Sequence, residues 1–470
     1  MDNNTESYRV EHDFLGEANI PDSAYYGIQS LRGRDNFEIT GRKLSEFPLF
    51  IIALAYTKKA AAMANNVLGV LDKERSDVIV KACDDIIAGK YHDQFIVDMM
   101  QGGAGTSTNM NANEVIANIA LEYAGRKKGD YEYIHPNNHV NLSQSTNDVY
   151  PTSIRIATYF MTEELLKSIQ GFIDALKGKE NEFDDVLKMG RTQLQDAVPM
   201  TLGQEFGAYA VTISEDMDRI TYVMRLISEI NMGATAIGTQ INTPDTYSEV
   251  VSEILRNETK LPLVAAENLV EATQDTGVFI HISGVFKRYA VKISKICNDL
   301  RLLSSGPRAG LNEINLPPMQ PGSSIMPGKV NPVIPEVVNQ VAFQVIGNDL
   351  TITMACEAGQ LELNVMEPVI AFRLFDTISI LKNATDTLTE KCIKGITANR
   401  DVCMGYVENS IGLCTVLVPI IGYEASSSIA KEALKTNNSV YNLVLEKGLL
   451  SKEQLDVVLK PENMTGPRKK

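Results

Sequence analysis

The sequence predicts an all-α protein whose centre is a bundle of five long helices. Apolar residues recur at steps of three and four over five long segments with few prolines. No part of the chain alternates strands with helices as a parallel sheet requires. The 470 residues are therefore predicted to form three domains: an N-terminal helical domain of residues 1–143, a central long-helix bundle of residues 144–398 and a small C-terminal helical domain of residues 399–470.

Prolines and glycines delimit the five long helices. The first is predicted in the proline-free stretch 152–198, which carries the apolar series Met161, Leu165, Ile169, Phe172 and Leu176. The others are predicted at about 204–230, within 262–307, at about 335–364 and at about 368–399. Helices of this length span ~40 to 60 Å, which is longer than a compact domain. Their wide apolar faces predict that the core is completed by association with other subunits.

Composition excludes several classes of partner. The chain has 44 Lys and Arg residues against 59 Asp and Glu residues, a net charge of -15, which would repel nucleic-acid phosphates and anionic membranes. The N-terminus lacks the pattern of a secretory signal, and no stretch reaches the ~18 apolar residues of a membrane span. The six cysteines show no C-x-x-C spacing, which predicts reduced thiols. We therefore expect a cytoplasmic protein that binds neither nucleic acid nor membrane.

Four segments concentrate glycine with small hydroxyl and amide residues beside predicted helix starts. They are QGGAGTSTNMN (101–111), SQSTND (143–148), GRTQLQDAVP (190–199) and PGSSIMPGKVNP (321–332). Taken singly, such residues are more often helix caps or tight turns than binding sites. A phosphate-binding P-loop is excluded because Gly322 and Gly328 are separated by five residues and Lys329 is followed by Val330. The five histidines lack the spacing of a metal site, so no metal ligand is predicted.

The remaining interpretation of these segments is that they bind an anion. Backbone N–H groups at helix N-termini and Ser, Thr and Asn side chains suit a carboxylate, with Lys329 and Arg191 as the local positive charges. If a proton next to a carboxylate were removed, a serine beside glycine and lysine could act as the base. The residues alone do not decide between this interpretation and capping.

The segment GSSIMPGKVNP resembles the signature of the fumarase/aspartase superfamily. Within that superfamily, HPNNHVNLSQSTND, GRTQLQDAVPMTLGQEF, GATAIGT and EAGQLELNVMEPVI resemble the aspartate ammonia-lyases. The resemblance covers nearly the whole chain. It implies a three-domain all-α fold and a homotetramer in which the bundles form a twenty-helix core. It also implies active sites that are shared among three subunits.

The resemblance further implies a reaction and the residues that perform it. Ser323 is the expected catalytic base on a mobile loop, and the expected substrate ligands are Thr106, Ser145, Thr146, Asn147, Thr192, Gln193, Ser324, Lys329 and Asn331. The implied reaction is the reversible deamination of L-aspartate to fumarate and ammonia, by removal of the Cβ proton and anti elimination through an enediolate. No cofactor is expected in the chemistry, and an activating divalent cation such as Mg²⁺ is left open.

Position 193 bears on the main alternative, a fumarate hydratase that interconverts malate and fumarate. Fumarases resemble GRTHLQDA at this point, whereas this chain has Gln193. A glutamine side chain cannot exchange a proton as a histidine does, so Gln193 disfavours the hydratase. A second alternative is a non-catalytic structural protein with this fold, which the full set of expected site residues disfavours.

Overall fold

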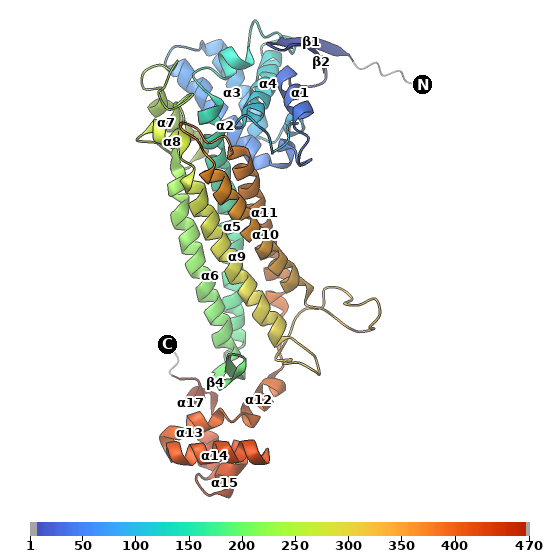
Figure 1. The fold of residues 1–470 in the computed structure, drawn as a ribbon, viewed down its shortest axis with the longest axis vertical. Coiled ribbons are helices and arrows are strands. Elements are labelled where there is room, and N and C mark those ends of the chain that lie inside the picture. Colours follow the sequence, from blue (N-terminus) through green and yellow to red (C-terminus); the bar gives the residue numbers. More distant parts are fainter. Residues whose placement is uncertain (1–6, 467–470) are drawn as a thin grey trace. The chain divides into compact units, whose positions relative to one another are not determined.

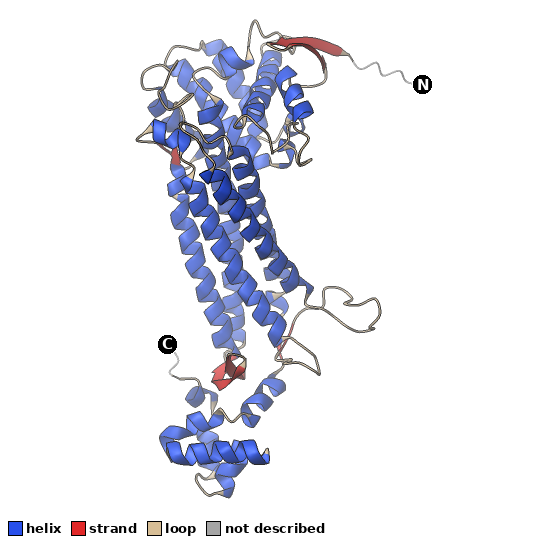
Figure 2. Ribbon diagram, in the orientation of Figure 1, coloured by secondary structure: helices blue, strands red, loops and turns tan. Residues whose placement is uncertain are grey.

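A computed structural model describes residues 7–466 of the chain. Helices dominate these residues, and the strands are short and form two-stranded sheets (Figure 2). The prediction of an all-α fold is confirmed. The described residues divide into two compact units, the first formed by 7–166, 218–288 and 344–381, the second by 167–217, 289–343 and 382–466. The three domains proposed from the sequence follow other boundaries and stay a prediction.

Five helices of 23 to 37 residues form the long elements of the described chain (Figure 1). They are α5 (Thr146–Glu182), α6 (Leu202–Met224), α9 (Gly277–Leu303), α10 (Val333–Glu357) and α11 (Glu367–Lys391). Each passes from one unit into the other. The prediction of five long helices is confirmed, although α6, α10 and α11 end six to eight residues before the positions expected from the sequence.

The prediction that one helix fills the stretch 152–198 is wrong at both ends. Helix α5 begins at Thr146 and contains Pro151, and it ends at Glu182. Strands β3 (Leu187–Thr192) and β4 (Gln195–Thr201) then form an antiparallel hairpin. A stretch without proline can form a helix but need not do so, and Gly190 disfavours a helix at its own position.

Pro151 is accommodated in α5 by a substitute hydrogen bond. Proline has no N–H group, so the carbonyl of Asn147 four residues earlier loses its helical donor. The side-chain amide of Asn231 donates to this carbonyl at 3.1 Å instead. A polar residue from another segment thus fixes the first turn of α5.

The first unit contains the N-terminal elements and one half of the long helices. Its other elements are β1 (Tyr8–Asp13), β2 (Gly16–Pro21), α1 (Ile28–Asn36), α2 (Pro48–Val67), α3 (Lys73–Ile87), α4 (Thr106–Tyr123), β5 (Glu229–Ile230), α7 (Tyr247–Thr259), β6 (Val264–Ala265) and α8 (Leu269–Gln274). Helix α2 packs against α3, α4 and α7. Six of its twelve buried residues are alanines, whose small side chains let neighbouring helices approach closely.

Polar contacts connect the halves of the long helices within each unit. In the first unit, Ser283 on α9 donates to Asp349 on α10 at 2.8 Å, and Asn348 donates to Thr377 on α11 at 3.1 Å. In the second unit, Tyr209 on α6 donates to Asp299 on α9 at 2.9 Å. Hydroxyl and amide groups buried in this way specify which helices are neighbours.

The second unit also contains the C-terminal helices. These are α12 (Arg400–Asn409), α13 (Leu413–Ile421), α14 (Tyr423–Thr436), α15 (Val440–Glu446), α16 (Lys452–Val458) and α17 (Pro461–Met464). They enclose a small core that includes the fully buried Leu417, Ile429, Val444 and Leu455. Strand β7 (Ile314–Asn315) pairs with β8 (Thr397–Ala398). Short helices packed around one small core thus form this part of the described chain.

Two further features concern the described part of the chain as a whole. Between residues 7 and 466, no helix on its own has the length and composition of a membrane span, while α12 and α13 together meet those criteria with a bend of 51° between them. All six cysteines are free thiols, and five of them are buried.

A buried acid at the start of α11 makes stability depend on pH. Burial raises the pKa of Glu367 from its ordinary value of 4.5 to about 8, and the Arg155 guanidinium opposes this shift. The folded protein therefore binds this proton more tightly than the unfolded chain between those two values, so stability falls as pH rises through that window. The effect is on the order of 1 kcal/mol for each unit of pKa difference.

We expect Glu367→Gln to remove this dependence. Thermal unfolding measured from about pH 5 to about pH 8 should show the variant gaining stability relative to the wild type as pH rises. The exposed Glu362→Gln, on the segment just before α11, is the matched control and should follow the wild-type curve. Parallel curves for wild type and Glu367→Gln would contradict the expectation.

Candidate active site

The residues expected at the active site fall into two groups, one in each unit. Thr106, Ser145, Thr146 and Asn147 belong to the first unit. Thr192, Gln193, Ser323, Ser324, Lys329 and Asn331 belong to the second.

Thr106 is the first residue of α4 and its side chain is exposed. Gly105 before it has a φ of 92°, and a Cβ atom there would lie 2.5 Å from the ring of Tyr150. Only glycine fits this turn without strain or collision. The Thr106 hydroxyl donates to the carbonyl of Gly103 at 2.7 Å. The N–H groups of Thr106 and Thr108 are also bonded, to the Gly103 carbonyl and to the Gln101 side chain, both at 3.0 Å. The exposed Thr106 side chain is therefore the polar group that this helix start presents to solvent.

Ser145, Thr146 and Asn147 form the start of α5. The Ser145 hydroxyl accepts from the N–H of Asn147 at 3.3 Å, and the Asp148 carboxylate accepts from the N–H of Ser145 at 2.9 Å. Ser145 therefore caps the second residue of α5, and the Asp148 side chain bonds back to the N–H of Ser145, so the capping interpretation of Ser145 is confirmed. Thr146 accepts from the side chain of Asn109 on α4 at 3.1 Å. The starts of α4 and α5 are therefore directly connected.

A buried polar network, which was not predicted from the sequence, lies beneath these helix starts. Lys58 of α2 is fully buried, and its ammonium donates to Asn141 at 2.8 Å and to Gln144 at 2.9 Å. Asn109 and Asn113 of α4 also donate to the Asn141 side-chain oxygen, each at 3.2 Å. The network fixes the segment that leads into Ser145.

Burial lowers the pKa of Lys58 to about 7, and the neighbouring Asp148 carboxylate opposes this shift. A signal for its burial was present in the sequence. Lys58 continues the helical series Ile51, Leu54, Ala55, Ala61 and Ala62, all of which are buried. A lysine on the apolar side of a helix requires hydrogen-bond partners, and the asparagine-rich segment supplies them.

Thr192 and Gln193 lie at the tip of the β3–β4 hairpin. Its two-residue turn consists of Gln193 and Leu194, with φ angles of 54° and 62°. Turns of this kind usually contain asparagine and glycine, because both central residues must adopt the left-handed conformation. Strained residues of this type concentrate at functional sites. Gln193 and Leu194 are both exposed, so the hairpin directs its tip outward from the unit.

Arg191 is committed to an ion pair and is not an available anion ligand. Its guanidinium lies 2.7 Å from the carboxylate of Glu313, which is completely buried, and the ammonium of Lys188 lies 3.2 Å from the same carboxylate. Of the two positive charges considered from the sequence, the structure therefore leaves Lys329 for an anion. Lys329 is exposed.

Ser323, Ser324, Lys329 and Asn331 lie on the loop between β7 and α10. The base of this loop is closed by two hydrogen bonds, from the N–H of Gly322 to the carbonyl of Lys329 and from the Asn331 side chain to the carbonyl of Gly322, both 2.7 Å. A Cβ atom on Gly322 would lie 2.5 Å from the Lys329 carbonyl oxygen. Glycine is thus required for closure, and Asn331 has a structural role in this state.

The Ser323 hydroxyl accepts two backbone N–H groups, from Ile325 at 3.2 Å and Met326 at 3.0 Å. Donors aimed at this oxygen stabilise it as an alkoxide more than as an alcohol. Ile325 beyond it is 83% exposed. An exposed apolar side chain at the tip of a loop with a closed base is typical of a lid that covers a site when substrate binds.

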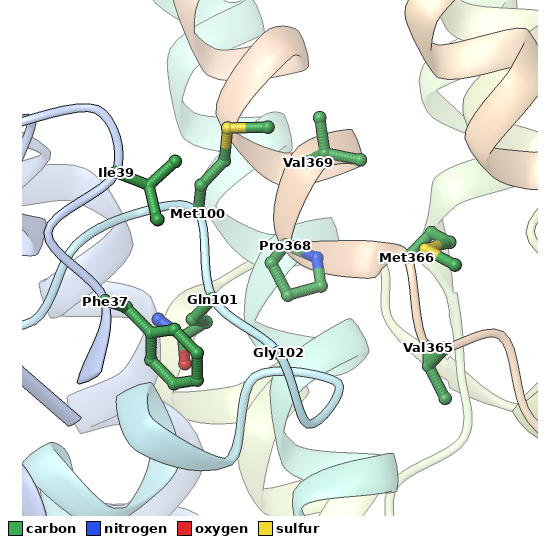
Figure 3. A pocket seen from close by; sticks show the side chains of 9 residues that line it. All are labelled: Phe37, Ile39, Met100, Gln101, Gly102, Val365, Met366, Pro368 and Val369. Carbon is green, nitrogen blue, oxygen red and sulfur yellow. The ribbon is translucent and has the colours of Figure 1, made fainter. Parts of the chain in front are cut away.

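Two cavities in the described chain do not suit a dicarboxylate. One of about 350 Å³ in the first unit is lined by Phe37, Ile39, Met100, Gln101, Gly102, Val365, Met366, Pro368 and Val369, and Figure 3 shows its mainly aliphatic, aromatic and thioether walls. Its one polar side chain, Gln101, donates to Thr108 at 2.9 Å and to the carbonyl of Asp98 at 2.8 Å. Another of about 540 Å³, among the C-terminal helices, contains the acidic Glu408 and Asp456. Neither offers a positive charge.

No group of three or more His, Cys, Asp or Glu side chains that could hold a metal ion occurs in residues 7–466. His135 and His139 stabilise a turn of π-helix at Pro136–Val140. The His139 ring accepts from the backbone N–H of His135 at 2.8 Å, and the His135 ring accepts from that of Asn137 at 3.0 Å.

Comparison with known proteins gives two family matches. Residues 16–347 match the family described as lyase, and residues 413–466 match the family described as fumarase C C-terminus. Together these matches extend over both units of the structure.

Individual proteins are similar over almost the full chain. An aspartate ammonia-lyase from Helicobacter pylori (strain ATCC 700392 / 26695) is 59% identical, with 98% of each chain covered. Another, from Escherichia coli (strain K12), is 54% identical over 98% of this chain and 97% of that one. Among solved structures, a fumarate lyase:delta crystallin from Brucella melitensis bound to cobalt has a TM-score of 0.96 at 53% identity, covering 98% of this chain and 100% of that one. A class II fumarase from Schistosoma mansoni has a TM-score of 0.92 at 37% identity over the same shares.

Proposed function

Because this chain belongs to the fumarase/aspartase superfamily of lyases, and within it to the aspartate ammonia-lyases, we propose that it catalyses the reversible deamination of L-aspartate to fumarate and ammonia. The observation that carries the proposal is Ser323, whose hydroxyl accepts two backbone N–H groups on a glycine-closed loop. Relatives of that name at 54 to 59% identity support it.

In the proposed mechanism the Ser323 alkoxide removes one Cβ proton of L-aspartate. The electron pair of that C–H bond moves into the adjacent carboxylate and gives an enediolate, whose extra negative charge needs several donors. Cleavage of the Cα–N bond then takes the bonding pair to nitrogen, releases ammonia and forms the double bond of fumarate. Gly322 and the hydrogen bond from Asn331 join the two ends of the loop. A loop held in this way suits a lid that carries Ser323 over the substrate.

We assign substrate binding to both groups of site residues. The start of α4, with the exposed Thr106, and the partly exposed start of α5, with Ser145, Thr146 and Asn147, suit one carboxylate. Lys329, Ser324 and Asn331 on the loop suit the other, and Thr192 and Gln193 on the hairpin complete the set. Lys329 supplies the positive charge for these contacts, because Arg191 is paired with Glu313.

We propose that the enzyme is a homotetramer whose active sites each draw on three subunits. Phe343, Leu350 and Met354 on α10 support association, because they lie on one side of the helix and are 61 to 65% exposed. A helix with such a face is more stable when a partner covers it. Light scattering after size exclusion would measure the assembly directly.

We propose no cofactor for the chemistry and leave activation by Mg²⁺ as a separate question for assay. We also propose a cytoplasmic location, which the six free thiols support, since disulfides are rare in reducing compartments.

The main test distinguishes this activity from fumarate hydration. Purified protein is incubated with L-aspartate and, separately, with L-malate, and fumarate is followed by its ultraviolet absorbance. A rise with L-aspartate alone is the expected result. A rise with L-malate alone would overturn the choice of substrate, and Gln193 is the residue that makes this outcome unexpected.

A further inference from the structure

Asp148 lies in the first turn of α5 and is completely buried. One carboxylate oxygen accepts from the N–H of Ser145 at 2.9 Å. The other accepts from the N–H groups of Gly233 at 3.1 Å and Thr235 at 2.9 Å. Three backbone donors from two separate segments thus converge on one side chain.

The segment 231–236 makes further bonds to the same helix start. The Asn147 side chain donates to the carbonyl of Ala236 at 2.8 Å, and the Asn231 side chain donates to the carbonyl of Asn147 at 3.1 Å. The second bond replaces the helical donor that Pro151 lacks. Asn147, one of the proposed substrate ligands, is therefore held on both its side chain and its backbone.

The segment 231–236 is itself rigidly packed. Gly233 has a φ of 93°, and a Cβ atom there would lie 2.9 Å from the Cα of Ser248 on α7. Thr235 also adopts a left-handed conformation, with a φ of 59°. Asn231 donates a second hydrogen bond, to Thr273 on α8, at 3.1 Å. Asp148 thus connects the start of α5 to a segment that has little freedom to move.

We propose that Asp148 is a positioning residue that holds Ser145, Thr146 and Asn147 in the geometry that binds the substrate carboxylate. This inference rests on the proposed function and adds a residue to it. An ionised carboxylate can accept from all three N–H groups at once. An asparagine has the same shape, but one of its two polar groups is an NH₂ donor. It would face at least one of the three N–H groups and could not accept a hydrogen bond from it.

Burial opposes a negative charge at this position. Burial raises the pKa of Asp148 to about 6, against the opposing effect of its hydrogen bonds and of Lys58. The charged groups and titratable groups that face it are Lys58 on α2 and Tyr247 on α7, and segment 231–236 contains none. Keeping Asp148 ionised therefore costs desolvation free energy. A role in fixing the geometry of the binding site explains why a charge is present there.

The variant that tests the proposal is Asp148→Asn, with Glu114→Gln as the matched control. Glu114 is also a buried carboxylate that accepts three backbone N–H groups, from Gly27, Gln29 and Ser30, but it holds a segment outside the proposed site. Amide hydrogen exchange of the unliganded protein measures both segments without reference to catalysis.

We expect Asp148→Asn to speed exchange at 143–148 and 231–236 by about tenfold or more, while Glu114→Gln leaves those segments unchanged. The KM for L-aspartate should rise by about tenfold to a hundredfold in Asp148→Asn, and stay near wild type in Glu114→Gln. The proposal would be overturned if exchange in Asp148→Asn stayed within twofold of wild type, or if Glu114→Gln increased exchange at 143–148 and 231–236 equally. An unchanged KM in Asp148→Asn would also overturn it.

Wild-type protein gives an independent test by pH. As pH falls through about 6, Asp148 takes up a proton in the folded state and can no longer accept all three N–H groups. Exchange at 143–148, corrected for its intrinsic pH dependence, should then increase in the wild type and stay flat in Asp148→Asn. If the corrected exchange rate at 143–148 in the wild type did not change with pH, the proposal would be overturned, even where the variant does not fold. If wild type lacks activity toward L-aspartate but the exchange results hold, the proposed function fails and the structural role of Asp148 stands.

Discussion

Replacing Ser323 with alanine is expected to lower kcat for L-aspartate deamination by on the order of 10³-fold, because the variant lacks the group that removes the Cβ proton. KM should change much less, since the proposed ligands of the substrate remain. The Ser323 side chain contributes only two local hydrogen bonds to a partly exposed loop, so thermal unfolding should stay close to that of the wild type. Initial rates of fumarate formation measure the effect.

Ser305→Ala is the matched control for this experiment. Ser305 also accepts a backbone N–H in a loop of the second unit, from Leu311 at 3.0 Å, but lies outside the proposed site. Its variant should keep wild-type kcat. If Ser323→Ala retained more than a tenth of the wild-type kcat, Ser323 would not be the base.

Replacing Lys329 with methionine is expected to raise the KM for L-aspartate by about 10²-fold, which corresponds to about 3 kcal/mol. Methionine keeps much of the length of the side chain and removes its charge. Within the described residues, the other positive groups of this loop and hairpin are Arg191 and Lys188, and both are bound to Glu313, so neither is available to compensate. Steady-state kinetics at constant ionic strength measures the change.

Two further variants complete the Lys329 experiment. Lys329→Arg keeps the charge but changes the geometry, so its KM should lie between those of the wild type and Lys329→Met. Lys431→Met, on the exposed surface of α14, should behave as wild type. A KM within threefold of wild type for Lys329→Met would remove Lys329 from the substrate site.

The sequence determined the long helices because their apolar spacing is a local property that repeats over many turns. It failed at the hairpin after α5, because a stretch without proline need not continue as a helix. Glutamine and leucine seldom adopt the left-handed φ angles of a two-residue turn, so Gln193 and Leu194 did not predict one.

Sequence reasoning also found the segments that carry the expected site residues, because glycine, serine and asparagine beside helix starts are recognisable in the chain itself. It could not assign a partner to each polar group. Arg191 and Lys329 looked equivalent in the sequence, and only the position of the buried Glu313 showed that the first is already paired.

By itself, the sequence determined the helical class of this protein, its family and the residues expected to perform its chemistry, since these follow from local periodicity and from short motifs. Only the tertiary structure decided which buried charges hold those motifs in place. Lys58 and Asp148 are separated by 90 positions in the chain, yet both act on the segment 141–148. Contacts between such distant residues depend on how the helices pack, and no local pattern encodes them.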